Sequence, residues 1–256
     1  MADHSQLSDS EIRRYQKHIM IPGIGKEGQL KLKNSSVLVI GAGGLGCPVL
    51  QYLTAAGVGR IGLMDFDLVS ENNLQRQILY GASDIGKLKS IISKQRLSKL
   101  NNNVDIDILN IRFNKENAMP LVNDFDIIVD ATDNIESRYV INDACIAGGK
   151  PMVHGAIYRF EGEVSVFNYN NGPTYRCYNP EDEKKYNNPE PAETGIMNVL
   201  PGITGTYMAS EVIKLILQLG DVLSGQVLIF NILTNKHYLF KVKAKEENKK
   251  INKLNN

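Results

Sequence analysis

The sequence predicts an α/β fold, a doubly wound sheet whose parallel half is continued by antiparallel strands. Two observations predict this fold. An apolar run over residues 37–40 is typical of a buried parallel strand, and a helical apolar period then leads to a second such strand over 61–64. Nearer the C-terminus, residues 158–169 alternate as a hairpin does, and two further strands over 226–231 and 237–242 flank a turn.

A glycine-rich turn, GAGGLG over residues 41–46, joins the first strand to the following helix. Its glycines let the backbone turn tightly and approach a phosphate, and the N–H groups at a helix start favour an anion. The second strand ends on Asp65, whose carboxylate can accept hydrogen bonds from a ribose. This order predicts a Rossmann-like nucleotide-binding unit, with a purely structural glycine turn as the alternative. The glycines do not distinguish NAD, FAD, SAM and ATP.

Length and composition favour one sizeable domain. The chain has 256 residues and a hydrophobic content of 43%, which suffices for a packed core. A net charge of +1 gives no electrostatic case for binding nucleic acid or a membrane surface. No apolar run reaches the roughly 18 residues of a membrane span, and the polar N-terminus is unlike a secretory signal. Three cysteines form no disulfide framework, so we expect a cytoplasmic protein.

The chain divides into an N-terminal helical arm, a single domain and a disordered tail, over residues 1–34, 35–243 and 244–256. In the arm, Ser8 and Glu11 match a capping box ahead of a helix over 11–20. In the domain, residues 170–194 lack an apolar period and predict a long mobile crossover loop of the kind that covers binding sites. The tail is charged and rich in asparagine, which predicts disorder.

Two cations follow the second strand. Arg76 lies in a polar segment at the edge of the sheet where such folds bind ligands, and it either contacts a polyphosphate or is simply solvated. Lys89 lies in the first turn of a helix that runs to about Leu100. Because the helix dipole disfavours a cation there, a phosphate contact is the favoured explanation for Lys89.

A third strand, over residues 126–131, ends in Thr132, Asp133 and Asn134 just before a helix. Asp133 therefore lies at the same edge of the sheet as Asp65. An N-cap role for one of these three residues and a metal or ligand contact are both open, and they are compatible.

Other singled-out residues have structural interpretations. His154 follows a short strand and can line the pocket, although a hydrogen-bonded structural histidine is the favoured interpretation. Cys47 and Cys145 are interpreted as buried core thiols. The hairpin is expected to turn around Glu161-Gly162, and a helix is expected over 204–219.

Five motifs occur in order and at family-like spacing: GAGGLG, LMDFDLVSENNLQRQ, Gly86-x-x-Lys89, ATDN and GITGTYMASEVIKLI. In this combination the chain resembles the E1-like MoeB/ThiF/HesA adenylyltransferases, which activate ubiquitin-like sulfur-carrier proteins. The resemblance covers about residues 7–243. The combined set is specific, whereas no single motif would be.

The resemblance implies ATP rather than NAD as the nucleotide. It implies three catalytic residues, Arg76, Lys89 and Asp133, where Lys89 would steady the α-phosphate in its transition state and Asp133 would bind Mg²⁺. The glycines would hold the phosphates, Asp65 would bind the ribose, and Asn73 and Arg76 would contact the phosphates. The implied nucleotide-binding set is Gly41, Gly43, Gly44, Gly46, Asp65, Asp67, Asn73, Arg76, Lys89 and Asn134.

A further contact is implied from a second subunit. In the family, an arginine of the N-terminal helix reaches into the neighbouring subunit's ATP site, and the matching position here is Lys17. Lysine keeps the charge but loses the bidentate fork of arginine. The resemblance thus implies a homodimer in which Lys17 contributes to the partner's site.

The implied function is ATP- and Mg²⁺-dependent adenylation of the C-terminal glycine carboxylate of a ubiquitin-like sulfur carrier of MoaD or ThiS type. The carrier would end in Gly-Gly, pyrophosphate would be released, and the pathway would be molybdopterin or thiamin biosynthesis. The residues themselves fit this chemistry. A carboxylate that attacks the α-phosphate needs no protein nucleophile, only alignment and charge neutralisation by Arg, Lys and Mg²⁺.

Two departures from the family pattern concern cysteine. The family commonly carries a structural zinc in two CxxC pairs, but here the first pair has become Thr174-x-x-Cys177 and the second is absent, so no zinc is predicted. Many members also have a cysteine in the region that matches residues 191–195, where none occurs here. We therefore expect the reaction to stop at the adenylate, with Cys177 as the only loop thiol that could substitute.

Three alternatives remain open at this point. The same fold could adenylate a short peptide or a tRNA-bound carboxylate instead of a carrier. It could also be a non-catalytic E1-like scaffold, although Arg76, Lys89 and Asp133 argue against that. An NAD-dependent oxidoreductase would leave the same three residues unexplained.

Overall fold

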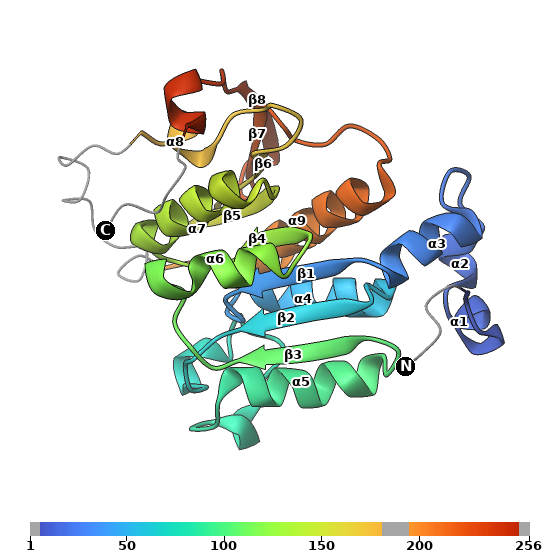
Figure 1. Cartoon of the computed structure of the whole chain (residues 1–256). Helices are drawn as coiled ribbons and strands as arrows, with labels where there is room; N and C mark the ends of the chain where they lie inside the picture. Colours follow the sequence, from blue (N-terminus) through green and yellow to red (C-terminus); the bar gives the residue numbers. More distant parts are fainter. Residues whose placement is uncertain (1–5, 181–194, 251–256) are drawn as a thin grey trace.

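An eight-stranded sheet forms the centre of the computed structural model, which describes residues 6–180 and 195–250 (Figure 1). The strand order is β3-β2-β1-β4-β5-β6-β7-β8. The pairs from β3 to β5 are parallel and those from β5 to β8 are antiparallel, which confirms the predicted fold class. The strands are β1 (Ser36–Ile40), β2 (Arg60–Met64), β3 (Asp105–Leu109), β4 (Ile127–Asp130), β5 (Met152–Tyr158), β6 (Glu161–Phe167), β7 (Gln226–Asn231) and β8 (Lys236–Lys241).

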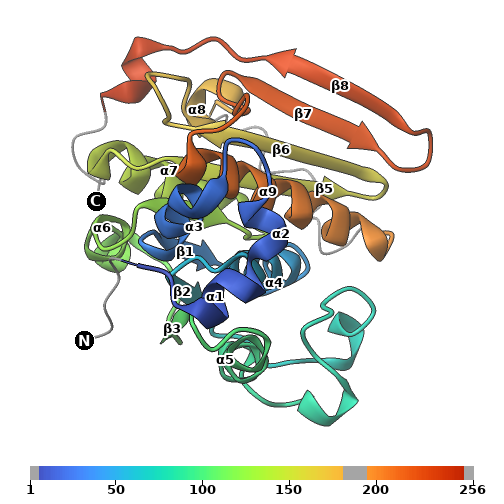
Figure 2. The ribbon, with the colours of Figure 1, turned by 90° about the vertical axis from the view of Figure 1, so that its right-hand side faces the viewer.

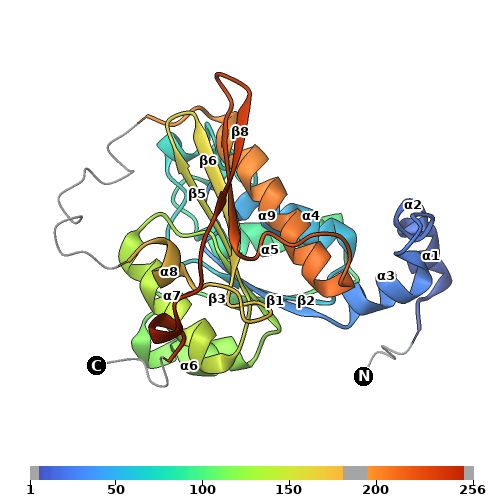
Figure 3. The same cartoon turned by 90° about the horizontal axis from the view of Figure 1, so that it is seen from above.

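Helices cover both faces of the sheet (Figure 3). One face packs against α4 (Gly46–Ala56), α5 (Lys89–Leu100) and α9 (Val199–Leu217), and the other against α6 (Lys115–Asn123) and α7 (Ile135–Gly148). Along β1, Val37 and Val39 belong to the first core, whereas Leu38 and Ile40 belong to the second. Because successive side chains of a strand point to opposite faces, a strand covered on both sides has an unbroken apolar sequence.

The N-terminal arm consists of α1 (Asp9–Arg14), α2 (Gln16–Ile19) and α3 (Gly25–Lys33), which face the viewer in Figure 2. The capping box is confirmed, because the Ser8 N–H donates to Glu11 Oε2 at 2.8 Å and the Glu11 N–H donates to Ser8 Oγ at 3.2 Å. The single helix expected over 11–20 is instead broken at Tyr15. This side chain is buried, and its hydroxyl accepts a hydrogen bond from Asn101 at 2.8 Å.

The hairpin turn lies two residues earlier than predicted. Tyr158 pairs with Glu161, so the turn is Arg159-Phe160, with Arg159 at a φ of 51°. Gly162 lies inside β6 and not in the turn. A Cβ at this position would lie 2.5 Å from an atom of the Phe230 ring, so the strand needs a glycine here. The glycine thus signals close packing of an aromatic ring rather than a turn.

Part of the predicted mobile loop and part of the predicted disordered tail have defined structure. Residues 181–194 and 251–256 lie outside the described residues. Before the first gap, α8 (Tyr175–Tyr178) buries Tyr175 against α7. In the tail, η5 (Glu246–Lys249) forms a 3-10 turn, which differs from the predicted disorder. The difference has a local cause, since the Lys245 N–H donates to the buried Cys177 Sγ at 3.3 Å.

Other expectations concern the core and the membrane. Cys47 and Cys145 are fully buried, as predicted.

Helix α9 begins at Val199, five residues before the predicted start. Pro201 lies in its first turn, where proline is tolerated. In the described part of the chain, no helix has both the length and the apolarity that a membrane span requires.

The ion pair between Glu11 and Lys33 joins α1 to α3 within the arm. Its loss should lower the free energy of unfolding. The two side chains are nearly buried and their charged atoms lie 2.9 Å apart. Burial opposes ionisation of Glu11, but the Ser8 N–H and Lys33 outweigh it and lower the pKa below its ordinary 4.5. We expect Glu11→Gln to lower the free energy of unfolding by about 1–2 kcal/mol near neutral pH.

The sign of the pH dependence follows from the lowered pKa. The contribution of Glu11 is complete above its ordinary pKa of 4.5 and is lost as the pH falls through the folded-state value. Urea unfolding of the wild type and of Glu11→Gln should therefore differ at pH 7 and converge in acid. Glu27→Gln, at an exposed position of α3, is the control. A constant difference at every pH would contradict this assignment.

Candidate active site

A pocket of about 460 Å³ lies at the carboxyl ends of β1, β2 and β4, which point to the same edge of the sheet (Figure 1). Backbone hydrogen bonds hold these strand ends together, from Gly41 N–H to Met64 O at 2.8 Å and from Ala131 N–H to Ile40 O at 3.0 Å. Most of the predicted site residues line this pocket: Gly41, Gly43, Gly44, Asp65, Asp67, Arg76, Lys89, Asp133 and Asn134.

Two of the glycines are required by the backbone itself. Gly41 has a φ of +100°, and a Cβ there would lie 2.6 Å from the Ala131 carbonyl oxygen. A Cβ on Gly46 would lie 1.9 Å from the Gly41 carbonyl oxygen. A side chain at Gly41 would force the turn away from the end of β4, and a side chain at Gly46 would force the turn itself open. Gly46 does not line the pocket, so its role is to close the turn.

Gly43 faces open space in the pocket, whereas a Cβ on Gly44 would lie 3.1 Å from Pro201 Cβ. A Cβ on Gly43 would meet nothing nearer than the Gln77 side chain at 3.6 Å. Within residues 6–180 and 195–250, the N–H groups of Gly43, Gly44, Leu45 and Gly46 donate no hydrogen bond. Unpaired N–H groups at the start of α4 can bind an anion, and a glycine without Cβ lets that anion approach the backbone.

Asp65 is held in place by the backbone on both sides. Its Oδ2 accepts the Ala42 N–H at 2.8 Å, and its Oδ1 accepts the Asp67 N–H at 2.9 Å. Burial raises the pKa of Asp65, and the nearby Lys89 charge and the two N–H groups only partly offset this effect. Each carboxylate oxygen keeps a second lone pair, so Asp65 can still accept a hydrogen bond from a hydroxyl group.

Lys89 is a buried cation that points into the pocket. Its side chain is only 6% exposed, and Nζ lies 3.0 Å from Oδ2 of Asp67, whose side chain is 54% exposed. Lys89 is also the first residue of α5, where the helix dipole opposes a positive charge. A buried ammonium with one solvated partner is well placed to neutralise a bound anion.

Arg76 and its neighbours differ in what they can reach. Arg76 lines the pocket, and its Nη1 donates to the Asn72 carbonyl at 3.1 Å. The Asn73 side chain does not line the pocket, because its Oδ1 caps a short turn by accepting the Ser70 N–H at 3.3 Å. Asn72 lines the pocket in its place.

The cap of α7 identifies which of Thr132, Asp133 and Asn134 is the N-cap. Asn134 is the N-cap, and its Oδ1 accepts the Ser137 N–H at 2.9 Å. Asp133 is exposed and lines the pocket, and its carboxylate has no hydrogen bond or ion pair within the described residues. The carboxylate is therefore available to a cation.

Lys17 lies far from this pocket in its own chain. It belongs to α2, which lies beyond the opposite edge of the sheet from the strand ends (Figure 1), and its side chain is exposed. Within the described residues of the chain, no interaction joins Lys17 to this pocket.

The pocket also contains residues that the sequence did not identify. Arg112 stands 5.8 Å from the centre of the Phe66 ring, and both line the pocket. Arg112 follows β3, so the rule that placed Asp65 and Asp133 at strand ends could have found it. Arg138, in the first turns of α7, also lines the pocket, and nothing in the sequence pattern separates it from a solvated arginine.

The donor groups fit magnesium better than zinc. Mg²⁺ is bound through one or two carboxylates together with substrate phosphates, and the free Asp133 carboxylate suits that mode. No group of three or more metal-ligating His, Cys, Asp or Glu occurs in the described residues. Around Cys177 the neighbours are the Thr174 hydroxyl at 3.4 Å, the Lys245 N–H and the Asn248 amide at 3.8 Å, which do not form a tetrahedral zinc site.

The glycine turn, the carboxylate after β2 and the cations at one sheet edge define a nucleotide-binding α/β protein of the doubly wound class. Within this class, the chain belongs to the ThiF family, whose model matches residues 15–253. The resemblance to MoeB, ThiF and HesA proteins is thereby confirmed.

Similar curated proteins are named as adenylyltransferases. The chain is 46% identical over 234 residues to the probable molybdopterin-synthase adenylyltransferase of Porphyra purpurea, with 91% of this chain and 61% of that protein covered. It is 44% identical over 228 residues to the sulfur carrier protein adenylyltransferase of Thermus thermophilus, with 87% and 84% covered. The chain thus spans less than two thirds of the Porphyra protein and most of the Thermus protein.

Solved structures share the fold. The complex of Escherichia coli MccB with ATP superposes with a TM-score of 0.80 at 22% sequence identity, covering 93% of this chain and 73% of that chain. PaaA superposes with a TM-score of 0.80 at 21% identity, covering 93% and 84%. At this level of identity the likeness establishes the architecture.

The glycine turn allows structural and ligand-binding roles to be separated. We expect Gly46→Ala to destabilise the protein by about 3 kcal/mol or more, because its Cβ meets backbone that cannot yield. Gly43→Ala should change the free energy of unfolding by less than about 0.5 kcal/mol. The same variant should weaken ATP binding about tenfold, since the methyl group stands between the anion and the N–H groups. Chemical unfolding and calorimetric titration with ATP measure the two effects, and unchanged ATP affinity in Gly43→Ala would contradict the assigned site.

Proposed function

We propose that this protein is an ATP- and Mg²⁺-dependent adenylyltransferase that activates the C-terminal glycine carboxylate of a ubiquitin-like sulfur carrier ending in Gly-Gly. One observation carries the proposal. Arg76, Lys89 and the free Asp133 carboxylate line the same pocket as the unpaired N–H groups of the glycine turn. The names of the two curated relatives support the same reaction class and carrier type.

The reaction needs alignment and charge neutralisation. The triphosphate would bind at the N–H groups of residues 43–46, with its ribose at Asp65. A carboxylate oxygen of the carrier then forms a bond to the α-phosphorus, and the bond from that phosphorus to the bridging oxygen breaks. The products are an acyl-adenylate and pyrophosphate. Arg76 and Lys89 neutralise the negative charge that develops in this step, and no protein nucleophile is required.

Magnesium would be held by Asp133 together with phosphate oxygens. When bound, it supplies positive charge that offsets the charge of the phosphates. The N-cap Asn134 fixes the first turn of α7, so the Asp133 carboxylate beside it stays directed to the pocket.

The proposed product is the adenylate itself. The sequence has no cysteine over residues 191–195, of which 191–194 lie outside the described residues. Cys177 does not line the pocket, and its sulfur is enclosed by the Thr174 hydroxyl and the Lys245 N–H. Later sulfur transfer would therefore use a thiol outside this sequence.

The proposal includes a homodimer. Lys17 is exposed at the far edge of the sheet from its own pocket, so it can complete a pocket only in a second copy of the chain. A closed two-fold arrangement would give two equivalent pockets, each with one Lys17 from the partner.

ATP–pyrophosphate exchange in Mg²⁺ tests the function. The purified protein is assayed with MoaD-type and ThiS-type carriers, with carriers that lack the terminal Gly-Gly, and with short peptides. Exchange that requires one intact carrier would support the proposal and identify the pathway. Exchange with peptides alone would replace the carrier by a peptide substrate, and ATP binding without any exchange would identify a scaffold.

Lys89 should act mainly on the chemical step. We expect Lys89→Ala to leave ATP binding nearly intact but to slow carrier-dependent exchange by about 10²-fold, a typical loss for one transition-state donor. The exposed neighbour Lys87→Ala is the matched control and should retain exchange. Thermal unfolding verifies that both variants are folded. Unchanged exchange in Lys89→Ala would refute its role.

Lys17 and Lys89 should complement each other between subunits. We expect Lys17→Ala to slow exchange about tenfold through the loss of one charged contact. A mixed dimer of Lys17→Ala and Lys89→Ala subunits contains one pocket with both lysines intact. Random mixing should therefore restore about a quarter of wild-type activity, because half of the dimers are mixed and each has one complete site. If mixing restores nothing while each variant dimerises, Lys17 does not reach the partner's site.

A further inference from the structure

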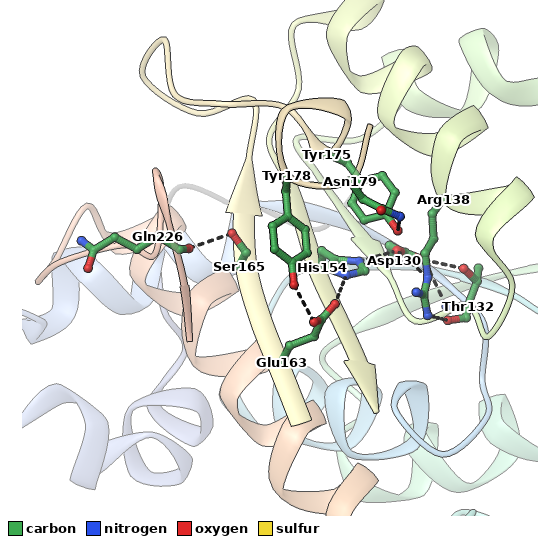
Figure 4. A network of polar contacts seen from close by, with 10 residues as sticks. All are labelled: Asp130, Thr132, Arg138, His154, Glu163, Ser165, Tyr175, Tyr178, Asn179 and Gln226. Atoms are coloured by element: carbon green, nitrogen blue, oxygen red, sulfur yellow. Dashed lines mark hydrogen bonds and ion pairs between the residues drawn. The ribbon is translucent and has the colours of Figure 1, made fainter. Parts of the chain in front are cut away.

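Four mostly buried charged side chains form a row that meets the pocket at Arg138, and Figure 4 shows the row. Asp130 on β4, His154 on β5 and Glu163 on β6 follow one another across three adjacent strands, and Arg138 of α7 lies at the end next to Asp130. The side chains of Asp130 and His154 are 0% exposed. Of the four residues, only Arg138 lines the pocket, and the proposed reaction uses none of them.

The two carboxyl neighbours of His154 favour a doubly protonated ring. Nδ1 lies 2.8 Å from Asp130 Oδ2, and Nε2 lies 3.2 Å from Glu163 Oε1. A neutral imidazole can donate only one hydrogen bond and would turn a lone pair towards the other carboxylate. As an imidazolium, His154 donates to both. Its charge, together with that of Arg138, then balances the fully buried carboxylate of Asp130 and the partly buried carboxylate of Glu163.

Asp130 transmits this arrangement to the pocket wall. Its Oδ1 accepts the Thr132 N–H at 3.1 Å and the Thr132 hydroxyl at 2.6 Å. Arg138 Nη2 donates to the Thr132 carbonyl at 3.2 Å, and Arg138 Nε, buried without a hydrogen-bond partner, lies 3.9 Å from Asp130 Oδ2. Thr132 is thus held at both of its backbone polar groups, and the next residue is Asp133.

The other end of the row reaches α8. The Tyr178 hydroxyl donates to Glu163 Oε2 at 2.8 Å, and the Tyr175 ring lies 5.0 Å from the His154 ring, centre to centre. The titratable and charged groups around His154 therefore come from four elements: Asp130 of β4, Glu163 of β6, Arg138 of α7, and Tyr175 and Tyr178 of α8.

We propose that His154, as an imidazolium between Asp130 and Glu163, is a positioning residue that fixes the Thr132–Asp133 turn and thereby sets the affinity of the pocket for magnesium-bound ATP. The inference rests on the proposed function, since it concerns the same nucleotide site. It assigns a role to a histidine that touches neither the nucleotide nor the metal. The residue acts through Asp130, whose carboxylate would otherwise lose one of its partners and release Thr132.

The charge states support this arrangement. Burial alone lowers the pKa of His154, but the Asp130 and Glu163 hydrogen bonds outweigh it and raise the pKa above its ordinary 6.5. Burial raises the pKa of both carboxyls, but the contact with His154 outweighs it and lowers them. The folded protein therefore favours the imidazolium at pH values where a free histidine is already losing its proton, and the imidazolium is lost as the pH rises through the raised value.

Calorimetric titration of magnesium-bound ATP between pH 6 and pH 9 tests the proposal with four proteins. In the wild type we expect the affinity to fall as His154 loses its proton. His154→Gln can bond to one carboxylate only, so it should bind about 10- to 100-fold more weakly at pH 6, with no such fall at higher pH. His237→Gln, at an exposed position of β8, should behave as the wild type, and its profile corrects for the titration of the nucleotide.

Glu163→Gln separates positioning from general structural damage. Glu163 does not line the pocket, yet its loss removes one of the two carboxylates that favour the imidazolium. We expect Glu163→Gln to retain wild-type affinity at pH 6 and to lose it at a lower pH than the wild type. A variant that merely weakened the fold would not shift this midpoint.

Nuclear magnetic resonance gives an independent measurement. With only four histidines in the chain, the His154 ring can be assigned and titrated directly. The amide signals of Thr132 and Asp133 should follow the same midpoint, and Glu163→Gln should shift ring and amides together. Amides that do not follow the ring, or equal midpoints in wild type and Glu163→Gln, would overturn the proposal. Absence of ATP binding in the wild type would instead overturn the proposed function.

Discussion

Close backbone contact between the glycine turn and the end of β4 is the constraint on which the site depends. Gly41 can approach the Ala131 carbonyl only because it has no Cβ, and Gly46 passes still closer to the Gly41 carbonyl. These contacts hold the ends of β1 and β4 next to each other at one edge of the sheet. The Gly41 N–H also donates to the Met64 carbonyl, which holds the end of β2 beside them. Side chains that follow three different strands therefore share one pocket, although they are far apart in the sequence.

Much of the fold and of the site could be predicted because it follows from periodicity and from one rule of parallel sheets. The rule placed Asp65 and Asp133 correctly at the pocket, and it would also have found Arg112. It could not choose between Asn72 and Asn73, since a short 3-10 turn decides which side chain faces inward. The predicted position of the hairpin turn was wrong because, in sequence, a glycine that makes room for an aromatic ring looks the same as a glycine that forms a turn.

Local sequence could not predict which residues pair with the buried charged side chains. His154 was expected to be hydrogen-bonded, but Glu163 reads in sequence as one polar position of an alternating strand. Only the pairing of β4, β5 and β6 brings its carboxylate to the ring opposite Asp130. The same holds for the arm, where the contact between Tyr15 and Asn101 joins residues 86 positions apart and divides the expected helix in two.

The mixture of charges in the pocket has a kinetic consequence. Among the described residues, four cations line it, Arg76, Lys89, Arg112 and Arg138, against the three carboxylates of Asp65, Asp67 and Asp133. The net charge of the whole chain is only +1, so a polyanion at a distance meets almost no attracting field. Encounter would then proceed at an ordinary diffusional rate with little dependence on ionic strength. The pocket must therefore select among anionic ligands after they have bound, when each anion competes with Asp67 for the ammonium of Lys89.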